Sequence, residues 1–404
     1  MVKRILIYTN HYYPEQFKIN EVVEWLSSNP DFQIRVVTCI PNYPGGSFFS
    51  GYNLLNSIST KEKKNIKINR LPVIPRVGGN YFMLSLNYIS YFISCFLFTI
   101  FLMVFKKKYD SILVHHTSPF LISIHPLIYG MFHSTKKYLW DLDIWPDTLE
   151  SLNVIKNKQV VNVMLWFVKL IYSGYDKVLV SSNSFISIVK SRSKKEVIYF
   201  PNWAEKELEE NIFDKKHILN FDNHKFKIMY TGNIGYAQNF DNLVKIIDLL
   251  KDENIQWVFV GGGRFKSQFI KLLSKKDLLC KCSFYNNVSI TKIPSYVKNI
   301  DAMYLSLNSS DLFNKTVPAK LQSYMALSKP VIGLISGEGA KIIKDANCGI
   351  CSENDNFTEL SKKILKLMNS SSLTLDKLGK NGRNFYDIYF SRINRKKQIL
   401  SLFK

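Results

Sequence analysis

The stretch TVPAKLQSYMALSKPVIG, residues 316–333, is the most informative segment of this 404-residue chain. Pro318 lies in a turn that opens a segment whose apolar residues recur at helical spacing, namely Leu321, Tyr324, Met325 and Leu327. Pro330 then ends the helix, and the apolar strand 331–334 follows directly. A helix, a tight turn and a buried strand in this order form one unit of a doubly wound sheet, so the stretch predicts an α/β fold.

The start of this predicted helix also suggests an anion site. Lys320, Gln322 and Ser323 lie in its first turns, where backbone N–H groups have no partner within the helix. These N–H groups and a nearby ammonium group favour an anion such as phosphate. The alternative is an ordinary α/β crossover with a solvated lysine.

Two glycine-rich turns strengthen the anion interpretation. The apolar strand 228–230 enters Gly232, Asn233 and Gly235, and an amphipathic helix follows from about residue 238. About 30 residues later, another apolar strand runs into Gly261–Gly263 and Arg264. Glycines let backbone approach a ligand closely, and the helix after each turn points its amino end at the same place.

Composition limits the class of protein. The chain is long enough for two domains, and its 46% hydrophobic content excludes a disordered protein. A net charge of +22 suggests an anionic partner, which could be nucleic acid, an acidic bilayer surface or a phosphorylated substrate, although solvated lysines explain part of the charge. The six cysteines show no zinc spacing and indicate reduced thiols.

Strands and helices are predicted to alternate in both halves of the chain, which favours parallel sheets covered on both faces. In the first half we predict strands at 5–9, 34–39, 66–71, 112–115, 138–140, 178–181 and 197–200, and helices at 19–26, 119–132, 160–171 and 185–189. We expect domains at 1–204 and 227–384, a polar linker at 205–226 and a final helix at 385–404.

Residues 81–105 form a long apolar segment. They carry no charge and include nine aromatic side chains, and Lys106, Lys107 and Lys108 follow. As a helix the segment would extend roughly 37 Å, enough to cross a bilayer. A true span would divide the first sheet between two compartments, so we expect a helix or a pair of helices that covers the sheet and exposes apolar surface at a membrane interface. A wholly buried helix and a true span remain alternatives.

Seven motifs in order resemble the GT-B-fold retaining glycosyltransferases of family 4, and within it the bacterial capsule and O-antigen L-fucosamine (N-acetyl-L-fucosaminyl) transferases. The motifs are HYYPEQFKINE (11–21), PNYPGG with a following GY (41–52), DIWPD (143–147), FPNWAE (200–205), TGNIGYAQNFDNL (231–243), TVPAKLQSYMALSKPVI (316–332) and GEGAKIIKDANCGI (337–350). The resemblance covers nearly the whole chain.

The resemblance implies a GT-B architecture: two Rossmann-like doubly wound domains that face a cleft. The second domain would bind a nucleotide-sugar donor and the first the acceptor, while the last helix, from about Phe385, would cross back to the first domain. Family members transfer the sugar with retention and need no metal cofactor, because backbone N–H groups and cationic side chains stabilise the leaving diphosphate.

On the donor side the resemblance assigns Lys320 as the cation at the diphosphate and Arg264 as a second cation, for which an exposed helix-start residue is the alternative. The predicted donor contacts are Gly232, Asn233, Gly235, Gly262, Gly263, Val288, Thr316, Pro318, Gln322 and Ser323. Many members carry two glutamates seven residues apart in this region, where this chain has Asn314 and Gln322. An amide accepts fewer hydrogen bonds than a carboxylate, so the orientation of the donor sugar is left open.

On the acceptor side Asp143 follows the predicted strand 138–140, at an edge where α/β sites gather. We expect it to orient or deprotonate the acceptor hydroxyl, with capping of the turn near residue 146 as the alternative. With Asp141 it spells DLD, a metal-binding pattern elsewhere, which we discount because the flanking residues match the GT-B family. The other predicted acceptor contacts are Glu15, Lys18, Asn20 and His116.

The expected function is transfer of a sugar such as N-acetyl-L-fucosamine from a UDP-sugar to a polyprenyl-diphosphate-linked saccharide. The protein would be cytoplasmic and peripheral at the inner face of the plasma membrane. A catalytically silent GT-B-fold subunit that binds a nucleotide-sugar or a partner transferase is the alternative. The chain shows no helix-turn-helix, RNP or zinc motif for nucleic acid, and no GxGxxG after the first strand for a dinucleotide.

Overall fold

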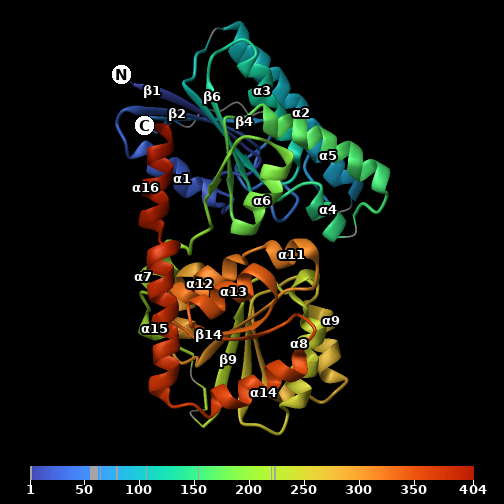
Figure 1. Ribbon diagram of the computed structural model, residues 1–404, viewed down its shortest axis with the longest axis vertical. Helices are drawn as coiled ribbons and strands as arrows, with labels where there is room; N and C mark the ends of the chain where they lie inside the picture. Colours follow the sequence, from blue (N-terminus) through green and yellow to red (C-terminus); the bar gives the residue numbers. More distant parts are fainter. Residues whose placement is uncertain are drawn as a thin grey trace. The chain divides into compact units, whose positions relative to one another are not determined.

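The computed structural model describes residues 2–54, 62–63, 65–78, 81–105, 107–152, 154–219, 221–222 and 224–404. Lys106, one of the three lysines after the apolar segment, lies outside these described residues. The chain divides into two compact units, which are Met1–Phe200 with Lys396–Lys404, and Pro201–Arg395 (Figure 1). The α/β class with two parallel-sheet units is confirmed.

The described residues of the first unit form an eight-stranded sheet of order β3-β4-β2-β1-β5-β6-β7-β8. The strands are β1 (Lys3–Thr9), β2 (Phe32–Cys39), β3 (Glu62–Lys63), β4 (Ile66–Leu71), β5 (Ser111–His116), β6 (Lys136–Asp141), β7 (Lys177–Val180) and β8 (Glu196–Tyr199). All neighbours are parallel except the short β3 beside β4. Each predicted strand is present, whereas β3 is too short for any periodicity to reveal it.

Helices cover both faces of this sheet (Figure 1). They are α1 (Lys18–Ser27), α2 (Tyr81–Val104), α3 (His125–Gly130), α4 (Asp147–Ser151), α5 (Lys158–Ser173) and α6 (Asn183–Arg192). The continuous helix predicted at 119–132 is instead a 3-10 turn, η1 (Phe120–Ile124), followed by α3. Pro126 explains the break, because proline has no N–H to donate and fits only the first turn of a helix.

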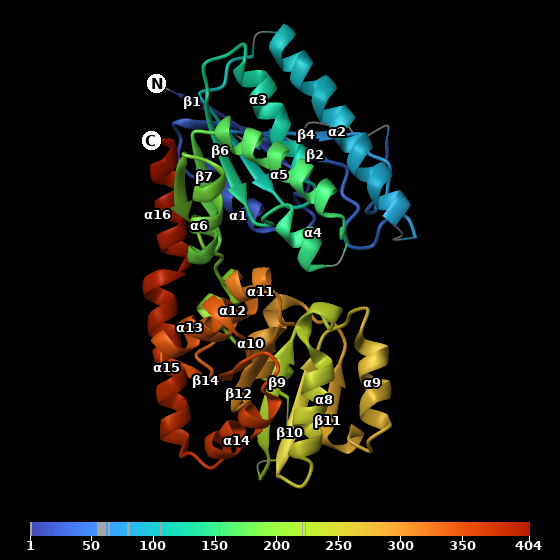
Figure 2. The same cartoon turned by 45° about the vertical axis from the view of Figure 1, so that its right-hand side comes forward.

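The apolar segment forms α2, which lies beside α3 in both views of the first unit (Figures 1 and 2). By length and composition alone, the part Phe82–Val104 could cross a membrane. One side of α2 is fixed to the sheet: the Tyr91 hydroxyl donates to the Thr9 carbonyl (2.7 Å), and the Thr99 hydroxyl bonds that of Tyr8 (2.8 Å).

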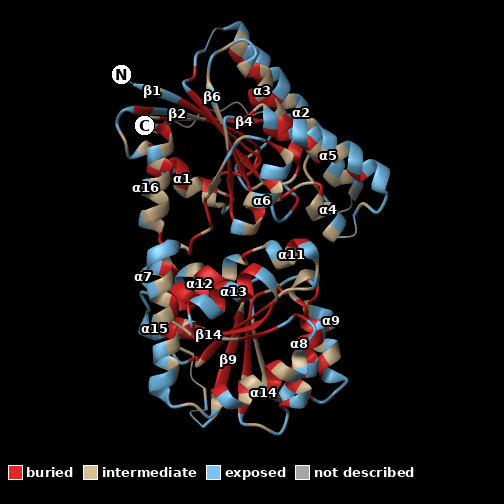
Figure 3. Ribbon diagram, viewed as in Figure 1, coloured by how far each residue is buried: buried red, intermediate tan, exposed pale blue. Residues whose placement is uncertain are grey.

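The opposite side of α2 is exposed, with 60% of Leu97 and 45% of Phe101 accessible (Figure 3). The alternative of a wholly buried helix is therefore wrong. The strands before and after α2, β4 and β5, belong to the same sheet.

The second unit contains a parallel six-stranded sheet of order β11-β10-β9-β12-β13-β14 among its described residues. The strands are β9 (Phe226–Thr231), β10 (Ile255–Val260), β11 (Cys282–Tyr285), β12 (Ala302–Ser306), β13 (Val331–Leu334) and β14 (Gly349–Ser352). The helices are α7 (Lys206–Glu210), α8 (Phe240–Leu249), α9 (Lys266–Ser274), α10 (Ile293–Val297), α11 (Asp311–Lys315), α12 (Ala319–Ala326), α13 (Gly337–Asp345), α14 (Phe357–Met368) and α15 (Ser372–Tyr389).

Two predicted boundaries differ from the structure. The stretch 205–226, predicted as a linker, includes α7, whose Leu208 is buried within the second unit. The final helix was expected to leave the second domain from about Phe385, but α15 stays there, because the Tyr386 hydroxyl donates to Glu209 (2.8 Å). Only Lys396–Lys404, which begin within α16 (Arg392–Phe403), group with the first unit.

Candidate functional site

The loops that carry the predicted donor residues follow the carboxyl ends of the second unit's strands. β9 pairs with β10 on one side and β12 on the other, so the strand order changes direction at β9 and β12. In an open α/β sheet, ligands bind in the crevice outside the strand ends at such a switch point. Gly232 follows β9, and the segment that leads to α12 follows β12.

The two glycine turns lie directly against one another. A Cβ on Gly261 would lie 2.1 Å from the Gly232 carbonyl oxygen, and one on Gly263 would lie 2.3 Å from that of Ile234. Both glycines have a positive φ, +147° and +151°. A side chain at either position would therefore be strained and would push the two turns apart.

Lys320 is brought to the first of these turns. Its Cε lies 3.1 Å from where a Cβ on Gly232 would be, and its Nζ lies 4.7 Å from the centre of the Tyr230 ring. Burial lowers the pKa of Lys320 to about 8. No carboxylate among the described residues forms an ion pair with it. A partly desolvated ammonium group beside an exposed backbone turn is a setting that favours a bound anion.

Tyr324 ties α12 to the end of β9, and Gly337 lets α13 approach α11 closely. The Tyr324 hydroxyl, one turn after Lys320, accepts a hydrogen bond from the Thr231 backbone N–H (3.1 Å) at the end of β9. Gly337, with φ +66°, opens α13 so close to the preceding segment that a Cβ there would lie 1.8 Å from the Asn314 carbonyl oxygen. Neither residue was a predicted site residue, although each lies in a quoted motif.

Other predicted donor residues lie nearby in different settings. Val288 follows β11, in the loop whose Asn287 amide packs 3.3 Å from where a Cβ on Gly262 would lie. Pro318 caps the amino end of α12. The Thr316 hydroxyl donates to the Leu312 carbonyl (2.9 Å), and so acts within its own turn.

Arg264 and Ser323 are less clearly directed at the turn. Arg264 is exposed in the turn between β10 and α9, which agrees with the alternative of a helix-start residue as well as with a ligand contact. The Ser323 hydroxyl donates back to the Ala319 carbonyl of its own helix (3.3 Å). Their assignment to the donor therefore stays a prediction.

The positions of the family's acidic pair are occupied by inward-facing amides. Gln322 is fully buried, and its amide nitrogen, oriented toward the first turn of α12, donates to the carbonyls of Pro318 (2.8 Å) and Ala319 (3.1 Å). Asn314 has a buried Oδ1 that lacks a hydrogen-bond partner among the described residues. Gln322 thus stabilises the first turn of α12, and Asn314 Oδ1 is a buried acceptor without a hydrogen-bond donor among the described residues.

In the first unit a polar network joins the carboxyl ends of β5 and β6. His116 Nδ1 lies 2.7 Å from Asp141 Oδ1, and the Tyr172 hydroxyl donates to Asp141 Oδ2 (2.5 Å). Asp143 accepts from both the backbone N–H and the hydroxyl of Ser118 (3.0 Å each). Asp143 does not cap α4, whose N-cap is Pro146, so the capping alternative is wrong.

The loop after β1 is held by Glu15, which is buried. One of its oxygens accepts from the backbone N–H groups of Asn42 and Tyr43 (2.7 Å each), and the other lies 2.6 Å from His11 Nδ1. The carboxylate therefore positions two loops. Asn20 donates to the Glu15 carbonyl (2.7 Å) and stabilises the same turn.

A cavity of about 640 Å³ adjoins this loop and is lined in part by Asn20, Tyr12, Tyr52 and Arg70. Aromatic faces with nearby polar groups suit a saccharide, since such sites combine apolar walls with a few placed hydrogen-bonding groups. Lys18, at the start of α1, lies 3.8 Å from Glu21. Its assignment to the acceptor stays a prediction.

Several buried polar atoms near the ends of β1 and β5 lack a hydrogen-bond partner among the described residues. They are Asn10 Oδ1, His115 Nε2, His116 Nε2 and Thr117 Oγ1. Buried polar groups are normally satisfied, so their concentration at one sheet edge marks a place for a polar ligand or water. Burial, with the neighbouring His11 and His116, lowers the pKa of His115 to about 3, so this ring is neutral.

Comparison with known proteins agrees with this arrangement. Residues 211–385 match the family model of the glycosyl transferases group 1. The chain is 24% identical over 339 residues to the "Putative colanic acid biosynthesis glycosyl transferase WcaI" of Escherichia coli K12, covering 80% of this chain and 81% of the relative.

Solved structures share the fold. The sucrose-phosphate synthase of Thermosynechococcus elongatus superposes with a TM-score of 0.73 at 15% identity, over 99% of this chain and 98% of that one. Anabaena HepE in complex with UDP superposes with a TM-score of 0.66 at 11% identity, over 99% of each chain. Together the family model, the relative and the fold support a glycosyltransferase of group 1 with the GT-B fold.

Proposed function

We propose that the protein transfers a sugar, with retention of anomeric configuration as in family 4, from a UDP-sugar to a lipid-diphosphate-linked saccharide. The product would be a repeat unit of a bacterial capsule or O-antigen, and N-acetyl-L-fucosamine is the proposed sugar. The observation that carries the proposal is the ammonium group of Lys320, held against the turn at Gly232 without an acidic partner among the described residues. The complex of HepE with UDP supports a UDP-sugar as the donor. The name of WcaI, which refers to colanic acid biosynthesis, supports a role in making a polysaccharide.

In this proposal the second unit binds the donor. Lys320 and the backbone N–H of Asn233 stabilise the negative charge that develops on the departing diphosphate. The other N–H groups of the turn at residues 232–235 already donate within the second unit. Arg264 is a further candidate cation at that diphosphate. No metal cofactor is part of the proposal, since these groups supply the charge stabilisation.

The first unit holds the acceptor. Asp143, fixed by Ser118, orients the attacking hydroxyl and accepts its proton, as a general base within hydrogen-bond reach can do. His116 and the loop held by Glu15 and Asn20 shape the same sheet edge. The exposed side of α2 would rest on the inner face of the plasma membrane, where a polyprenyl-linked acceptor is anchored.

The test is a screen of UDP-, GDP- and dTDP-sugars with membrane extracts as the source of acceptor and with the product measured by mass. We expect a new glycolipid from one UDP-sugar. Lys320→Met should reduce its formation by at least roughly a hundredfold, the scale of losing one transition-state donor. Lys362→Met, an exposed lysine of α14, is the matched control and should behave as wild type. Equal activity of both variants would contradict the role of Lys320.

A second candidate, a catalytically silent subunit that binds a nucleotide-sugar or a partner transferase, is favoured by the inward-facing amides at residues 314 and 322. Calorimetry separates the two. Donor binding without product from any sugar and extract would support the silent subunit, whereas product from a single UDP-sugar would exclude it.

A further inference from the structure

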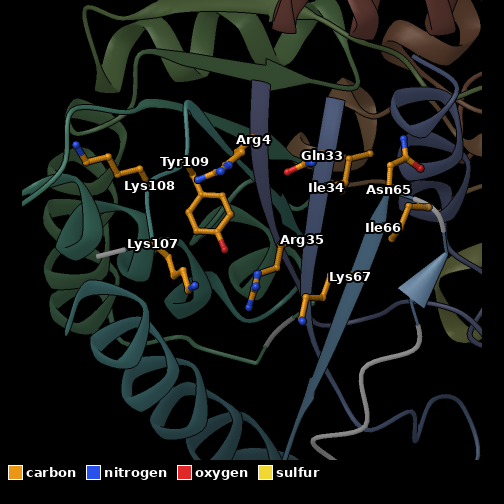
Figure 4. Close-up of a pocket in the computed structure, with 10 residues that line it drawn as sticks. All are labelled: Arg4, Gln33, Ile34, Arg35, Asn65, Ile66, Lys67, Lys107, Lys108 and Tyr109. Carbon is orange, nitrogen blue, oxygen red and sulfur yellow. The ribbon is translucent and has the colours of Figure 1, made fainter. Parts of the chain in front are cut away.

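The first unit has a basic cavity of about 380 Å³ at the amino ends of its strands, the edge opposite His116 and Asp143 (Figure 4). Its basic lining residues are Arg4, Arg35, Lys67, Lys107 and Lys108. No aspartate or glutamate is among the described residues that line it. The side chains of Arg35 and Lys107 are directed toward each other in this hollow and repel one another, so an anion between them would relieve that repulsion.

Strand register places Arg35 and Lys67 on the side of the sheet that α2 covers. The Tyr8 hydroxyl bonds Thr99 of α2, so Tyr8 faces α2, and Leu6, two residues earlier, shares that face. The register partner of Leu6 is Arg35, and that of Arg35 is Lys67. Both side chains therefore project from the same face as α2, beyond the point where the helix ends.

Residues 107–109, which follow α2, line one side of the cavity. Figure 4 shows the side chains of Lys107 and Tyr109 directed toward Arg35, whereas Lys108 points away. Burial raises the pKa of Tyr109, and the nearby Arg35 and Arg4 partly offset that rise. Tyr109 is buried, and its side chain offers an apolar wall with a polar tip beside the two cations.

We propose that this cavity binds the phosphate of an anionic phospholipid headgroup. Arginine and lysine are the residues that recognise phosphate, arginine through its planar fork and lysine as a point charge. A lipid is favoured over a free phosphate because Lys107 follows α2 almost directly. Phe101 and Val104 on the outward side of α2, and Phe105 just after it, are exposed. Headgroup phosphates lie just outside the apolar layer that such a helix side would enter.

This inference rests on the membrane contact proposed above for α2, but it makes a separate claim. The exposed side of α2 predicts binding to any bilayer, including a neutral one. The cavity predicts an added preference for anionic lipid that depends on Arg35 and Lys107. The two claims can therefore fail independently.

The experiment measures binding of the full-length protein to vesicles of phosphatidylcholine, with and without phosphatidylglycerol. The test variant is Arg35→Gln/Lys107→Gln. The matched control is Lys190→Gln/Lys194→Gln, which removes the same charge from exposed residues of the first unit outside the cavity. UDP binding and the unfolding temperature check that each variant is folded.

We expect wild type and control to bind anionic vesicles at least tenfold more tightly than neutral ones. The test variant should lose most of that preference, because its two missing basic residues are the ones that attract the anionic headgroups. If the control lost as much of the preference for anionic vesicles as the test variant, general charge attraction would explain the preference and the proposal would be overturned. Saturation with inorganic phosphate should weaken anionic-vesicle binding of wild type. If phosphate bound without changing vesicle binding, the cavity would be a site for a free anion. The proposal that it binds a lipid headgroup would then be wrong.

Discussion

The ammonium group of Lys320 is partly buried, and no carboxylate among the described residues forms an ion pair with it. Burial alone is the cause of its lowered pKa, about 8. A bound diphosphate would stabilise the protonated form and raise that pKa again. Binding of UDP should therefore be coupled to uptake of a proton at a pH near or above 8.

This coupling gives a prediction for pH dependence. As the pH rises through about 8, the free enzyme loses the proton on Lys320, and UDP affinity should fall by up to about tenfold for each further pH unit. Calorimetry in two buffers of different ionisation enthalpy measures both the affinity and the protons taken up. Lys320→Met should bind UDP more weakly and show no uptake from this site. The same uptake in wild type and variant would assign the titration to another group.

Gln322 shows what the sequence could not reveal at this scale. The pattern located it correctly in the first turns of α12, and a donor contact was the natural interpretation. Whether a side chain points to a ligand or back into its own helix depends on packing around the turn. Here the amide bonds the carbonyls of Pro318 and Ala319, and nothing in the spacing of residues encodes that choice.

At the scale of elements, the two sides of α2 have different roles. The side toward the sheet carries hydroxyl groups that bond Tyr8 and the Thr9 carbonyl, and the outer side carries exposed apolar residues. Composition predicted a helix but could not show which side of it faces the sheet. Nearly every position is apolar, and a helix that is apolar all round has little amphipathic signal. The structure shows which side faces the sheet and which side is exposed.

The two sides should respond differently to substitution. Thr99→Val leaves the buried Tyr8 hydroxyl without its partner and should lower the free energy of unfolding by about 1 kcal/mol, with unchanged vesicle binding. Leu97→Asn/Phe101→Asn should leave stability within about 0.5 kcal/mol but reduce binding to neutral vesicles at least tenfold, since each large apolar side chain contributes about 1.5–3 kcal/mol when buried.

Denaturant unfolding and vesicle sedimentation measure the two quantities. Leu249→Asn/Leu373→Asn, exposed apolar residues of the second unit, is the matched control for the outer-side variant. If that control lost vesicle binding to the same degree, the apolar side of α2 would not be the membrane contact.

At the scale of the whole molecule, the alternation of strands and helices predicted two parallel sheets, and each predicted strand is present. The sequence could not show which loops meet, because a switch point arises from strand order, and strand order depends on crossovers between distant segments. The meeting of the turns at Gly232 and Gly261, and the bond from Ser118 to Asp143, follow only from the assembled sheets.

The proposed position of the nucleotide predicts which backbone amides UDP should protect from hydrogen exchange. UDP should slow exchange severalfold at residues 232–235, 261–264 and 314–320, because a diphosphate at Lys320 would order the turns that meet there and reduce their local opening. All of these segments lie in the second unit. Lys320→Met at the same UDP concentration should lose most of this protection. Full UDP occupancy without protection in these loops would place the nucleotide elsewhere, and the assignment of the second unit as the donor domain would be wrong.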